Sequence, residues 1–475
     1  MEDLKKFLYE EISDNIKRAI QNGTLKPGDK LKSVRHFSEE LGVSNSTIFK
    51  AYFDLEGEGL IESKPKSGYY VRNSYSNRKL NKQKSTYEDN GICCISNREI
   101  IREVTQRPAR NDIIELATAV PDSSLLPISK IKKSIQRSYL NDPNAATCYE
   151  ETQGNTNLRS VISSLSLNWG GVFTEEDILV TNGCMEAMHI CLRAITKPGD
   201  TVALESPSFY GILQLLDNLQ LNVLEIPGDA KTGINIDSLK KLLHKYDVKA
   251  LLLISNYNNP TGSCMPDDNK VTVVQMISEM RIPVIENDIY GDLHFSKKRP
   301  KTLKSYDKEG WVMYCSSFSK SIAPGFRIGW CIPGKFMVRV KEEKFVNNLS
   351  TSSISQAVLL DFLKTGRYEL YLKRLRKKLQ LQSKSYLQSI TSYFPKDTNV
   401  SEPQGGLVLW IEMQKSKNAL KLYREALRHK ISITPGQIFS AQSDYINYIR
   451  ISYGSPMNDT IDGALKTIGR LIAEI

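Results

Sequence analysis

From about Asp112 onward, short apolar runs alternate with stretches of helical spacing, and this alternation restricts the fold more than any other feature. The runs expected to be strands are Ile178 to Val180, Thr201 to Leu204, Ala250 to Ile254, Pro283 to Ile285 and Trp311 to Cys315. A turn and a helical pattern follow each run, which is typical of a parallel sheet covered by helices. We therefore expect an α/β domain whose functional residues collect at the carboxyl ends of the strands.

Composition restricts the class of protein and its environment. The chain has 475 residues, which is enough for two or three domains, and it is 40% hydrophobic and 25% charged. Its apolar runs fall well short of the roughly 18 residues that a membrane helix requires, and the N-terminus lacks the apolar core of a secretory signal. The eight cysteines lack the spacing of a metal site or a redox pair, so we expect reduced thiols, no metal and a cytoplasmic protein.

The first seventy residues have a different pattern, that of a small helical domain. Leu4 to Gln21 carries apolar residues one helical turn apart, and Gly23 ends this helix. Ser33 is expected to cap a second helix and Ser44 a third. The buried face of the third helix is formed by Ile48, Ala51, Tyr52 and Leu55. Two short helices joined by a tight turn and followed by two apolar segments predict a winged helix-turn-helix.

Polar and basic groups lie on the exposed side of this expected domain. Those expected to contact DNA are Asn45, Ser46, Thr47, Lys50, Lys64 and Lys66. Short polar groups and a lysine at the start of the third helix suit the major groove, and the basic stretch from residue 63 to 87 suits a phosphate backbone. The net charge of +11 permits such an anionic partner. A small packing module would explain the apolar face but not this excess of cations.

The segment resembles the GntR-type winged helix-turn-helix. The matching strings are Pro27-Gly28-x-x-Leu31-x-Ser33-x-Arg35, Leu41-Gly42-Val43-Ser44, Thr47-Ile48, Ala51-Tyr52 and Leu55-Glu56-x-Glu58-Gly59-Leu60-Ile61. The resemblance adds Ser33, Arg35 and Gly68 to the residues expected at the DNA interface. Lys32, Asn45 and Lys66 depart from the family's usual pattern, which affects the operator sequence more than DNA binding itself. We expect this domain to occupy residues 1–73.

A polar, basic linker is expected from residue 74 to 111, between the winged helix and the larger domain. Its composition is that of a tether. Whether residues 92–104 pack on one of the domains as a helix is left open by the sequence.

A polar segment follows the last expected strand. It reads Ser316-Ser317-Phe318-Ser319-Lys320 and continues to Pro324-Gly325-Phe326-Arg327. A lysine just beyond a strand end can lose its charge and act as an amine nucleophile toward an aldehyde cofactor. Arg327 offers a planar fork for a phosphate, which Ser317 can help to bind. A lone S-x-x-K would indicate a solvated lysine, but the whole string is far more specific.

Three more motifs follow expected strands. Gly183 lets the amides of Cys184 and Met185 receive a phosphate at a helix N-terminus. Phe209 can stack on a planar ring, and Asn259 can bond a phenolic oxygen. Taken singly, these are only a helix start, a core aromatic and a turn.

In this order and spacing, the motifs resemble the class I/II aminotransferases over residues 112–475. The resemblance implies a fold-type I domain with a mostly parallel central sheet and a smaller α/β C-terminal subdomain. It implies that Lys320 forms the internal aldimine of pyridoxal 5'-phosphate and that Arg327 and Ser317 bind its phosphate. It also assigns Asn259 and Tyr290 to the ring oxygen and Phe209 to the ring face.

Two further positions and one departure complete this resemblance. Tyr149 matches a tyrosine that reaches the phosphate of the partner subunit, which implies a homodimer. Arg450 matches the arginine that binds an amino-acid carboxylate. Asn287 stands where the family has an aspartate facing the pyridine nitrogen, and a neutral amide keeps that nitrogen protonated poorly. Asp288 is expected to point to the opposite side of the strand.

A GntR-type domain in front of an aminotransferase-like domain is the arrangement of MocR-type transcriptional regulators, and the chain resembles that class throughout. We expect a dimeric regulator that binds a double-stranded DNA operator, pyridoxal phosphate and a small amino-acid or amine effector. One alternative is an active class I/II aminotransferase carrying an accessory DNA-binding domain, and another is a regulator without its cofactor. Asn287 disfavours complete transamination, so we expect a sensing domain that retains at most a half-transamination.

Overall fold

The computed structural model of the chain describes residues 7–57, 59–64, 67–71, 91–106 and 112–475. Lys66 and the basic stretch beyond residue 71, which were expected to contact DNA, lie outside these ranges, as does the side chain of Lys64.

The N-terminal domain is the predicted winged helix-turn-helix. Its elements are α1 (Leu8–Gln21), α2 (Val34–Leu41), α3 (Asn45–Gly57), β1 (Ile61–Lys64) and β2 (Gly68–Val71). Ser33 Oγ accepts a hydrogen bond from the backbone N–H of His36, and Ser44 Oγ accepts one from Thr47, so both expected caps are present. Gly42 ends α2 with a φ of 65°, which glycine adopts without strain. The two strands pair antiparallel as the wing.

The predicted apolar face of α3 forms the core of this domain. Its four residues, which are at most 1% exposed, are Ile48, Ala51, Tyr52 and Leu55. The Tyr52 hydroxyl donates to the Lys32 carbonyl at 2.8 Å, and its ring meets the Tyr69 ring edge-on at 4.9 Å between centroids. Tyr52 therefore ties α3 both to the segment before α2 and to the wing.

Within the described residues, nine strands form the central sheet of the larger domain, in the order β3-β7-β6-β9-β10-β11-β12-β5 with β8 beside β7. They are β3 (Ile92–Cys93), β5 (Leu179–Thr181), β6 (Thr201–Ser206), β7 (Asn222–Asp229), β8 (Gly233–Ile234), β9 (Ala250–Leu253), β10 (Val284–Asn287), β11 (Val312–Ser317) and β12 (Gly329–Ile332). The neighbours from β7 through β11 run parallel, and the remaining pairs are antiparallel. The prediction of a mostly parallel sheet is confirmed.

Side chains of the central strands alternate between two apolar cores. Leu204 and Leu252 pack with residues of α7 and α8 on one face, whereas Ala203, Leu251 and Leu253 pack with residues of α9 and α10 on the other. These helices are α7 (Cys184–Ile195), α8 (Tyr210–Asn218), α9 (Ile236–Lys245) and α10 (Asp267–Met280). Burial on both faces explains why the strands are continuous apolar runs in the sequence.

The chain after β11 departs from the expected strand–helix order. It turns at Pro324–Phe326 and returns as β12, antiparallel to β11, with Ser317 opposite Gly329. The apolar strand β12 is buried and lies between β11 and β5, so it joins these two strands into one sheet. Lys320 therefore lies in the connection between two paired strands.

Part of the expected linker packs on the larger domain. β3 pairs with β7, and α4 (Arg98–Thr105) follows it. Asn97 is 1% exposed, and its Nδ2 donates to the carbonyls of Gln437 and Ser440 at 3.1 and 2.6 Å. Residues 92–105 are thus a docked element, which answers the question that the sequence left open.

A second sheet, in the order β13-β14-β17-β16, forms the core of the predicted smaller subdomain near the C-terminus. The strands are β13 (Asn399–Val400), β14 (Val408–Glu412), β16 (Thr434–Pro435) and β17 (Tyr448–Ser452). A separate pair joins β4 (Ile114–Glu115) to β15 (Ile431–Ser432). The remaining helices are α5 (Ile128–Asn141), α6 (Thr156–Ser166), α11 (Met337–Asn348), α12 (Ser353–Lys364), α13 (Tyr368–Tyr393), α14 (Ala419–Arg428) and α15 (Asp459–Glu474).

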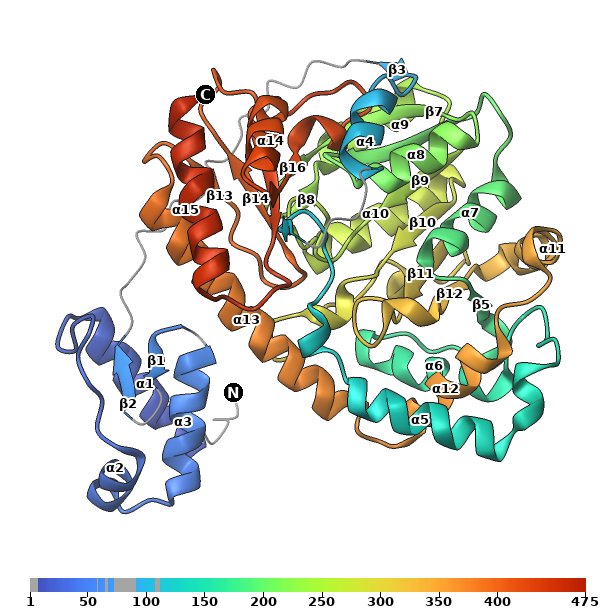
Figure 1. Ribbon diagram of the computed structural model, residues 1–475. Helices are drawn as coiled ribbons and strands as arrows, with labels where there is room; N and C mark the ends of the chain where they lie inside the picture. The colour runs from blue at the N-terminus through green and yellow to red at the C-terminus, as the bar shows by residue number, and fades with distance from the viewer. Residues whose placement is uncertain (1–6, 58, 65–66, 72–90, 107–111) are drawn as a thin grey trace.

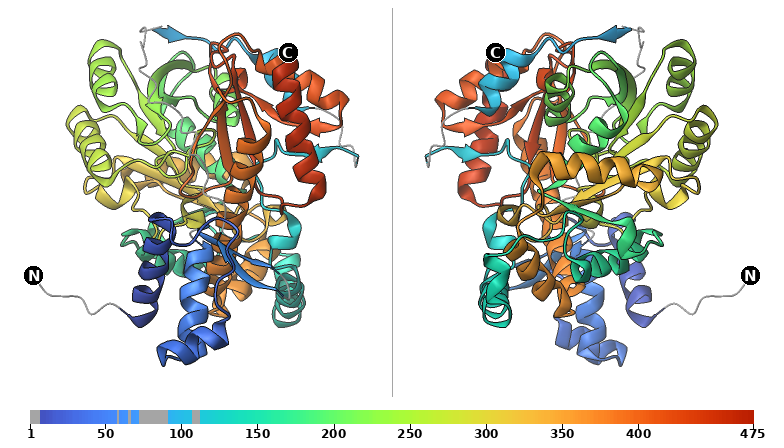
Figure 2. Two further views of the ribbon diagram at one scale, coloured as in Figure 1. Left: turned by 90° about the vertical axis from the view of Figure 1, so that its left-hand side faces the viewer. Right: turned by 90° about the vertical axis from the view of Figure 1, so that its right-hand side faces the viewer.

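The winged helix lies against one end of the larger domain, beside α13 (Figure 1), and the perpendicular views of Figure 2 agree. Lys377 Nζ of α13 donates to the Phe53 carbonyl of α3 at 2.6 Å, and Lys297 Nζ lies 3.1 Å from Glu10 Oε1 of α1. The far end of α3, where Asn45 and Ser46 are exposed, points away from the larger domain. Across the described residues, no helix is long and apolar enough to cross a membrane.

The position of Tyr52 yields a stability prediction. Replacing Tyr52 by alanine is expected to destabilise the winged helix by about 3 to 5 kcal/mol, because it removes a buried ring together with its hydrogen bond. Phe49 lies on the same helix but is 53% exposed, so Phe49→Ala should cost about 0.5 kcal/mol or less. The loss of unfolding free energy in each variant is measured from the urea dependence of hydrogen exchange at the α3 amides of the full chain. Equal losses in the two variants would contradict the assignment of Tyr52 to the core.

Candidate functional site

The predicted phosphate-binding residues meet at the N-terminus of α7. Arg327 Nη2 donates to the Asn182 carbonyl and Nη1 to Ser319 Oγ, each at 3.3 Å. Ser317 Oγ accepts a hydrogen bond from the Ser319 N–H at 3.3 Å. Among the described residues, the Arg327 guanidinium has no carboxylate partner. An exposed guanidinium beside helix amides and two hydroxyls is suited to an anion such as phosphate.

Gly183 is required for this arrangement. Its φ is 81°, and a Cβ at this position would collide with the Arg327 guanidinium. The absence of a side chain lets the start of α7 approach Arg327, so that the amides of Cys184 and Met185 and the guanidinium face the same space.

Lys320 has the electrostatic environment of a reactive amine. Its side chain is half-buried, and its Nζ has no hydrogen-bond partner among the described residues. Burial, together with the nearby positive charges of Arg450 and Arg327, lowers the pKa of Lys320 to about 8. The neutral amine is therefore accessible near physiological pH, as addition to an aldehyde requires.

A second cation whose charge acts on Lys320 is buried, and we call the region that holds Lys320, Arg327 and this cation the Lys320 pocket. Arg450 on β17 is 1% exposed, and its Nη1 donates to Asn259 Oδ1 at 2.9 Å. Its Nη2 donates to Thr434 Oγ1 at 2.9 Å and to the Ala117 carbonyl. Its Nε has no partner, and no carboxylate of the described residues forms an ion pair with it. A buried guanidinium without a counter-charge is suited to a carboxylate ligand.

Tyr290 and Phe209 lie at the same end of the sheet. Tyr290 is 4% exposed, and burial raises its pKa to about 12, opposed by the charge of Arg450 and a hydrogen bond with Asn259. Its phenol therefore stays protonated and can donate. Phe209 is half-buried at the start of α8, with its ring centroid 4.6 Å from that of Tyr210. The stacking role of Phe209 stays a prediction.

Asn287 and Asp288 point to opposite sides of β10, as the strand geometry predicted. Asn287 Oδ1 lies 3.4 Å from Cys184 Sγ, on the side of α7. Asp288 Oδ2 instead lies 2.6 Å from Arg299 Nη2 and accepts from the Tyr314 hydroxyl at 3.0 Å. Asp288 is therefore committed to a buried ion pair behind the pocket.

Tyr149 is separated from these residues in the single chain. It is 85% exposed, and among the described residues no hydrogen bond or ring contact joins it to Lys320, Arg327 or Arg450. The prediction that it serves a partner subunit is compatible with this exposure and stays a prediction.

The predicted DNA-binding residues are divided between two surfaces. Asn45 and Ser46 are exposed at the start of α3, although Asn45 Oδ1 also accepts from Ser38 Oγ at 2.7 Å. Lys50 Nζ lies 3.6 Å from the centroid of the Tyr9 ring, so it faces α1. Arg35 is exposed and lies 3.1 Å from Glu39.

The remaining predicted contacts lie near the ends of the helices and in the wing. Ser33 uses its side chain as the cap of α2, and Thr47 Oγ1 lies 2.8 Å from Ser44 Oγ. Gly68 has a φ of 113° at the start of the second wing strand. These residues shape the surface, and their contacts with DNA stay predictions.

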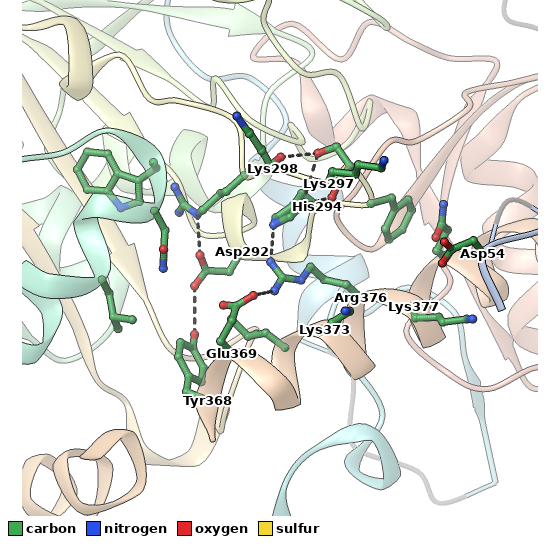
Figure 3. A pocket seen from close by; sticks show the side chains of 18 of the residues that line it. Asp54, Asp292, His294, Lys297, Lys298, Tyr368, Glu369, Lys373, Arg376 and Lys377 are labelled. Atoms are coloured by element: carbon green, nitrogen blue, oxygen red, sulfur yellow. Dashed lines mark hydrogen bonds and ion pairs between the residues drawn. The ribbon is translucent and has the colours of Figure 1, made fainter. Parts of the chain in front are cut away.

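A cavity of about 1300 Å³ lies between the winged helix and the larger domain (Figure 3). It is lined by cations of both domains, including Lys50, Lys297 and Lys377, but not by Lys320, Arg327 or Arg450. Asp292, Arg299 and Tyr314 also line it. Among the described residues, no cluster of His, Cys, Asp or Glu has the arrangement of a metal site.

Several contributors to the pocket were not predicted from the sequence. Thr434 and the Ala117 carbonyl hold Arg450, and the Cys184 thiol contacts Asn287. Thr434 reaches Arg450 because β16 pairs with β17 in that register. Such pairing between short strands leaves no signal in the sequence, so these contacts required the structure.

Two protein families match the chain. The description "Aminotransferase class I and II" matches residues 111–468, and "Bacterial regulatory proteins, gntR family" matches residues 8–71. The uncharacterized HTH-type transcriptional regulator YjiR of Escherichia coli (strain K12) is 34% identical over 464 residues, which cover 98% of either chain. The HTH-type transcriptional regulator NorG of Staphylococcus aureus (strain USA300) is 26% identical and covers 94% of this chain and 100% of its own.

Solved structures resemble the larger domain. A kynurenine aminotransferase of Pyrococcus horikoshii, crystallised with PMP, gives a TM-score of 0.73 at 27% identity over 79% of this chain and 94% of its own. LysN, an α-aminoadipate aminotransferase of Thermus thermophilus, gives the same values. The chain therefore belongs to the class I and II aminotransferase family, and it joins that domain to a GntR-type DNA-binding domain in the arrangement of the MocR-type transcriptional regulators.

Proposed function

We propose that the protein is a cytoplasmic, homodimeric transcriptional regulator that depends on pyridoxal phosphate and binds a double-stranded DNA operator. Its larger domain holds the cofactor on Lys320 and receives a small amino-acid or amine effector. The observation that carries this proposal is the direct docking of α3, the expected recognition helix, on α13 of the domain that contains the Lys320 pocket. A ligand-binding domain in contact with the DNA-binding helix is what a regulator requires.

The residues of the pocket fit the cofactor. Arg327, Ser317 and the amides of Cys184 and Met185 would hold the phosphate, and Asn259 and Tyr290 would bond the ring oxygen. When bound, pyridoxal phosphate supplies an aldehyde that captures primary amines reversibly. The neutral amine of Lys320 would hold that aldehyde, and burial together with the positive charge of Arg450 lowers the pKa of this amine below that of an ordinary lysine.

Arg450 supports an effector that carries a carboxylate. A buried guanidinium without a counter-charge is costly, and a ligand carboxylate would supply the missing partner for its Nε. Because the charge of Arg450 acts on Lys320, we propose that one ligand presents its carboxylate to Arg450 and its amino group at the Lys320 side of the pocket. An α-amino acid or a short ω-amino acid has this chemistry.

A continuous set of contacts runs from the pocket to the winged helix. Asp288 pairs with Arg299, whose Nε lies 2.6 Å from Asp292 Oδ1. Asp292 accepts from the Tyr368 hydroxyl of α13 at 3.1 Å (Figure 3). The same segment carries Lys297, which pairs with Glu10. We propose that a change at the β10 end of the pocket reaches the winged helix through this segment and α13.

Exposed apolar residues support the homodimer. They lie on α5, close in the fold to α12, and they are Ile128, Ile135, Tyr139 and Leu140, exposed by 45% to 76%. Tyr149 follows α5 in the chain and is also exposed, so one interface could bury the apolar face and bring Tyr149 to the partner's phosphate site.

DNA footprinting upstream of the protein's own gene, with and without pyridoxal phosphate and candidate amines, tests the proposed function. Protection of a specific segment, altered by the cofactor or an amine, is expected. Absence of protection under every condition would contradict the proposal. Sustained transamination with a 2-oxo acid would favour the aminotransferase alternative.

Ser46→Asp is expected to weaken operator binding at least tenfold, because it places a carboxylate where the helix meets the DNA. The substitution should leave α3 folded, since an acidic residue near a helix N-terminus is favourable. Ser164→Asp, at an exposed position of α6, is the control and should bind the operator normally. Equal affinity of the Ser46 variant and the control, measured by titration of labelled DNA, would exclude this surface as the interface.

Lys377→Met is expected to release the winged helix from α13. Methionine keeps the apolar part of the side chain near the Phe53 ring but removes the donor to the Phe53 carbonyl. A charged hydrogen bond of this kind contributes about 1.5 kcal/mol, so hydrogen exchange at the C-terminal end of α3 should accelerate roughly tenfold. Lys378→Met, which changes the exposed neighbour, should leave the exchange unchanged. Identical exchange in both variants would show that the docking does not depend on Lys377.

Covalent capture of pyridoxal phosphate is expected to rise with pH through about 8, the pKa of Lys320. Capture requires the neutral amine, so a lowered pKa of Lys320 increases capture at neutral pH. At pH 7 roughly one tenth of the Lys320 amine is neutral, against about one in three thousand for an ordinary lysine. Absorbance of the bound cofactor follows the titration. Lys320→Ala should abolish covalent capture, whereas Lys240→Ala, at an exposed position of α9, should not. A midpoint near 10 would contradict the environment described for Lys320.

A further inference from the structure

The side-chain amide of Asn287 has a defined orientation at the end of β10. Asn287 is 4% exposed, and its Oδ1 accepts the backbone N–H of Ile289 at 3.3 Å. Cys184 Sγ lies 3.4 Å from the same oxygen. Burial raises the pKa of the Cys184 thiol well above its usual value, so the sulfur keeps its proton and acts as a donor.

These two donors determine which end of the amide is the oxygen. A backbone N–H cannot accept a hydrogen bond, so the atom facing Ile289 must be Oδ1, and Nδ2 must point elsewhere. Within the described part of the chain, Nδ2 of Asn287 has no hydrogen-bond partner, although the residue is almost fully buried. The amide therefore offers two unused N–H donors from the position that faces the pyridine nitrogen in the family.

Asp288 cannot replace Asn287 as the partner of that nitrogen. Its Oδ2 accepts from Arg299 at 2.6 Å and from the Tyr314 hydroxyl at 3.0 Å, and its Oδ1 accepts from Asn256 Nδ2 at 3.0 Å. Both oxygens are occupied on the opposite side of β10. Turning this carboxylate toward the pocket would leave the buried Arg299 without a main partner, which typically costs about 3 to 5 kcal/mol.

We infer that Asn287 donates a hydrogen bond from Nδ2 to an unprotonated pyridine nitrogen and so holds the cofactor with a neutral ring. This inference rests on the proposed function, since it concerns the cofactor of that pocket. A donor stabilises the lone pair of the nitrogen, whereas a carboxylate stabilises the protonated nitrogen. The neutral ring withdraws electrons weakly, so the site favours exchange of amines at the aldehyde over removal of the α-proton of a bound amino acid.

This protonation state suits a receptor. Reversible amine exchange needs the aldehyde and Lys320, but it does not need a ring that accepts an electron pair. An effector that kept its α-proton would be released unchanged, so that occupancy of the pocket would follow the concentration of the effector. Asparagine in place of the family's aspartate at position 287 thus permits binding of the effector and disfavours its turnover, without removing any group that holds the cofactor.

The protonation state is measured by ¹⁵N NMR of the full-length protein loaded with pyridoxal phosphate labelled at the ring nitrogen. We expect the wild-type resonance at the position of an unprotonated pyridine between pH 6 and 9. Asn287→Asp should move it to the position of a protonated pyridine, because the carboxylate can still accept from Ile289 and Cys184 while facing the ring. Asn141→Asp, an exposed substitution at the end of α5, should leave the resonance in place.

Exchange of the α-proton of a bound amino acid with deuterium gives a second readout. Asn287→Asp should accelerate this exchange at least tenfold over the wild type. A protonated nitrogen in the wild-type protein, or one resonance position shared by the wild type and the Asn287 variant, would overturn the inference while leaving the regulator intact. A protein that binds no labelled cofactor at all would contradict the proposed function itself.

Discussion

Adjacent residues of a β-strand face opposite sides, and at the end of β10 this constraint determines what the pocket can do. Asn287 faces the start of α7, and Asp288 faces Arg299 and Tyr314. A shift of one residue that brought Asp288 into the pocket would place Ile289 beside Arg299, so the buried guanidinium would lose that carboxylate. The pairing of β10 with both β9 and β11 prevents that shift, because it would also turn the apolar side chains of the strand to the wrong core.

The ion pair behind the pocket contributes geometry more than stability. Arg299 is enclosed by Asp288 and Asp292, and burial of three charged groups offsets much of their attraction. What the cluster provides is a defined connection between the end of β10 and α13, through the hydrogen bond of Asp292 with Tyr368. Moving one of these three side chains away would leave an unpaired buried charge. The cluster therefore favours a small number of discrete side-chain arrangements over continuous deformation.

The sequence predicted those parts of the fold that depend on local spacing. Ile48, Ala51, Tyr52 and Leu55 are buried because helical periodicity places them on one face, and the parallel strands were found because both their faces are apolar. The strand β12 was missed because a four-residue run after a turn carries no period that separates it from a loop. The orientation of Lys50 toward Tyr9 and the contacts of Arg450 with Thr434 arise from packing between distant segments, which residue spacing does not encode.

The energy needed for regulation is small compared with the interactions that connect the domains. A tenfold change in operator affinity corresponds to about 1.4 kcal/mol between two arrangements of the winged helices. The hydrogen bond from Lys377 to the Phe53 carbonyl is of this size, since its charged donor is half-buried. A ligand at the pocket therefore does not need to reorganise the larger domain. It only has to move the segment between Asp288 and Lys297, or α13, far enough to lengthen one such contact. A pocket that binds amines without consuming them can provide that change repeatedly, and this is why a neutral amide at position 287 and a docked recognition helix are consistent features of one molecule.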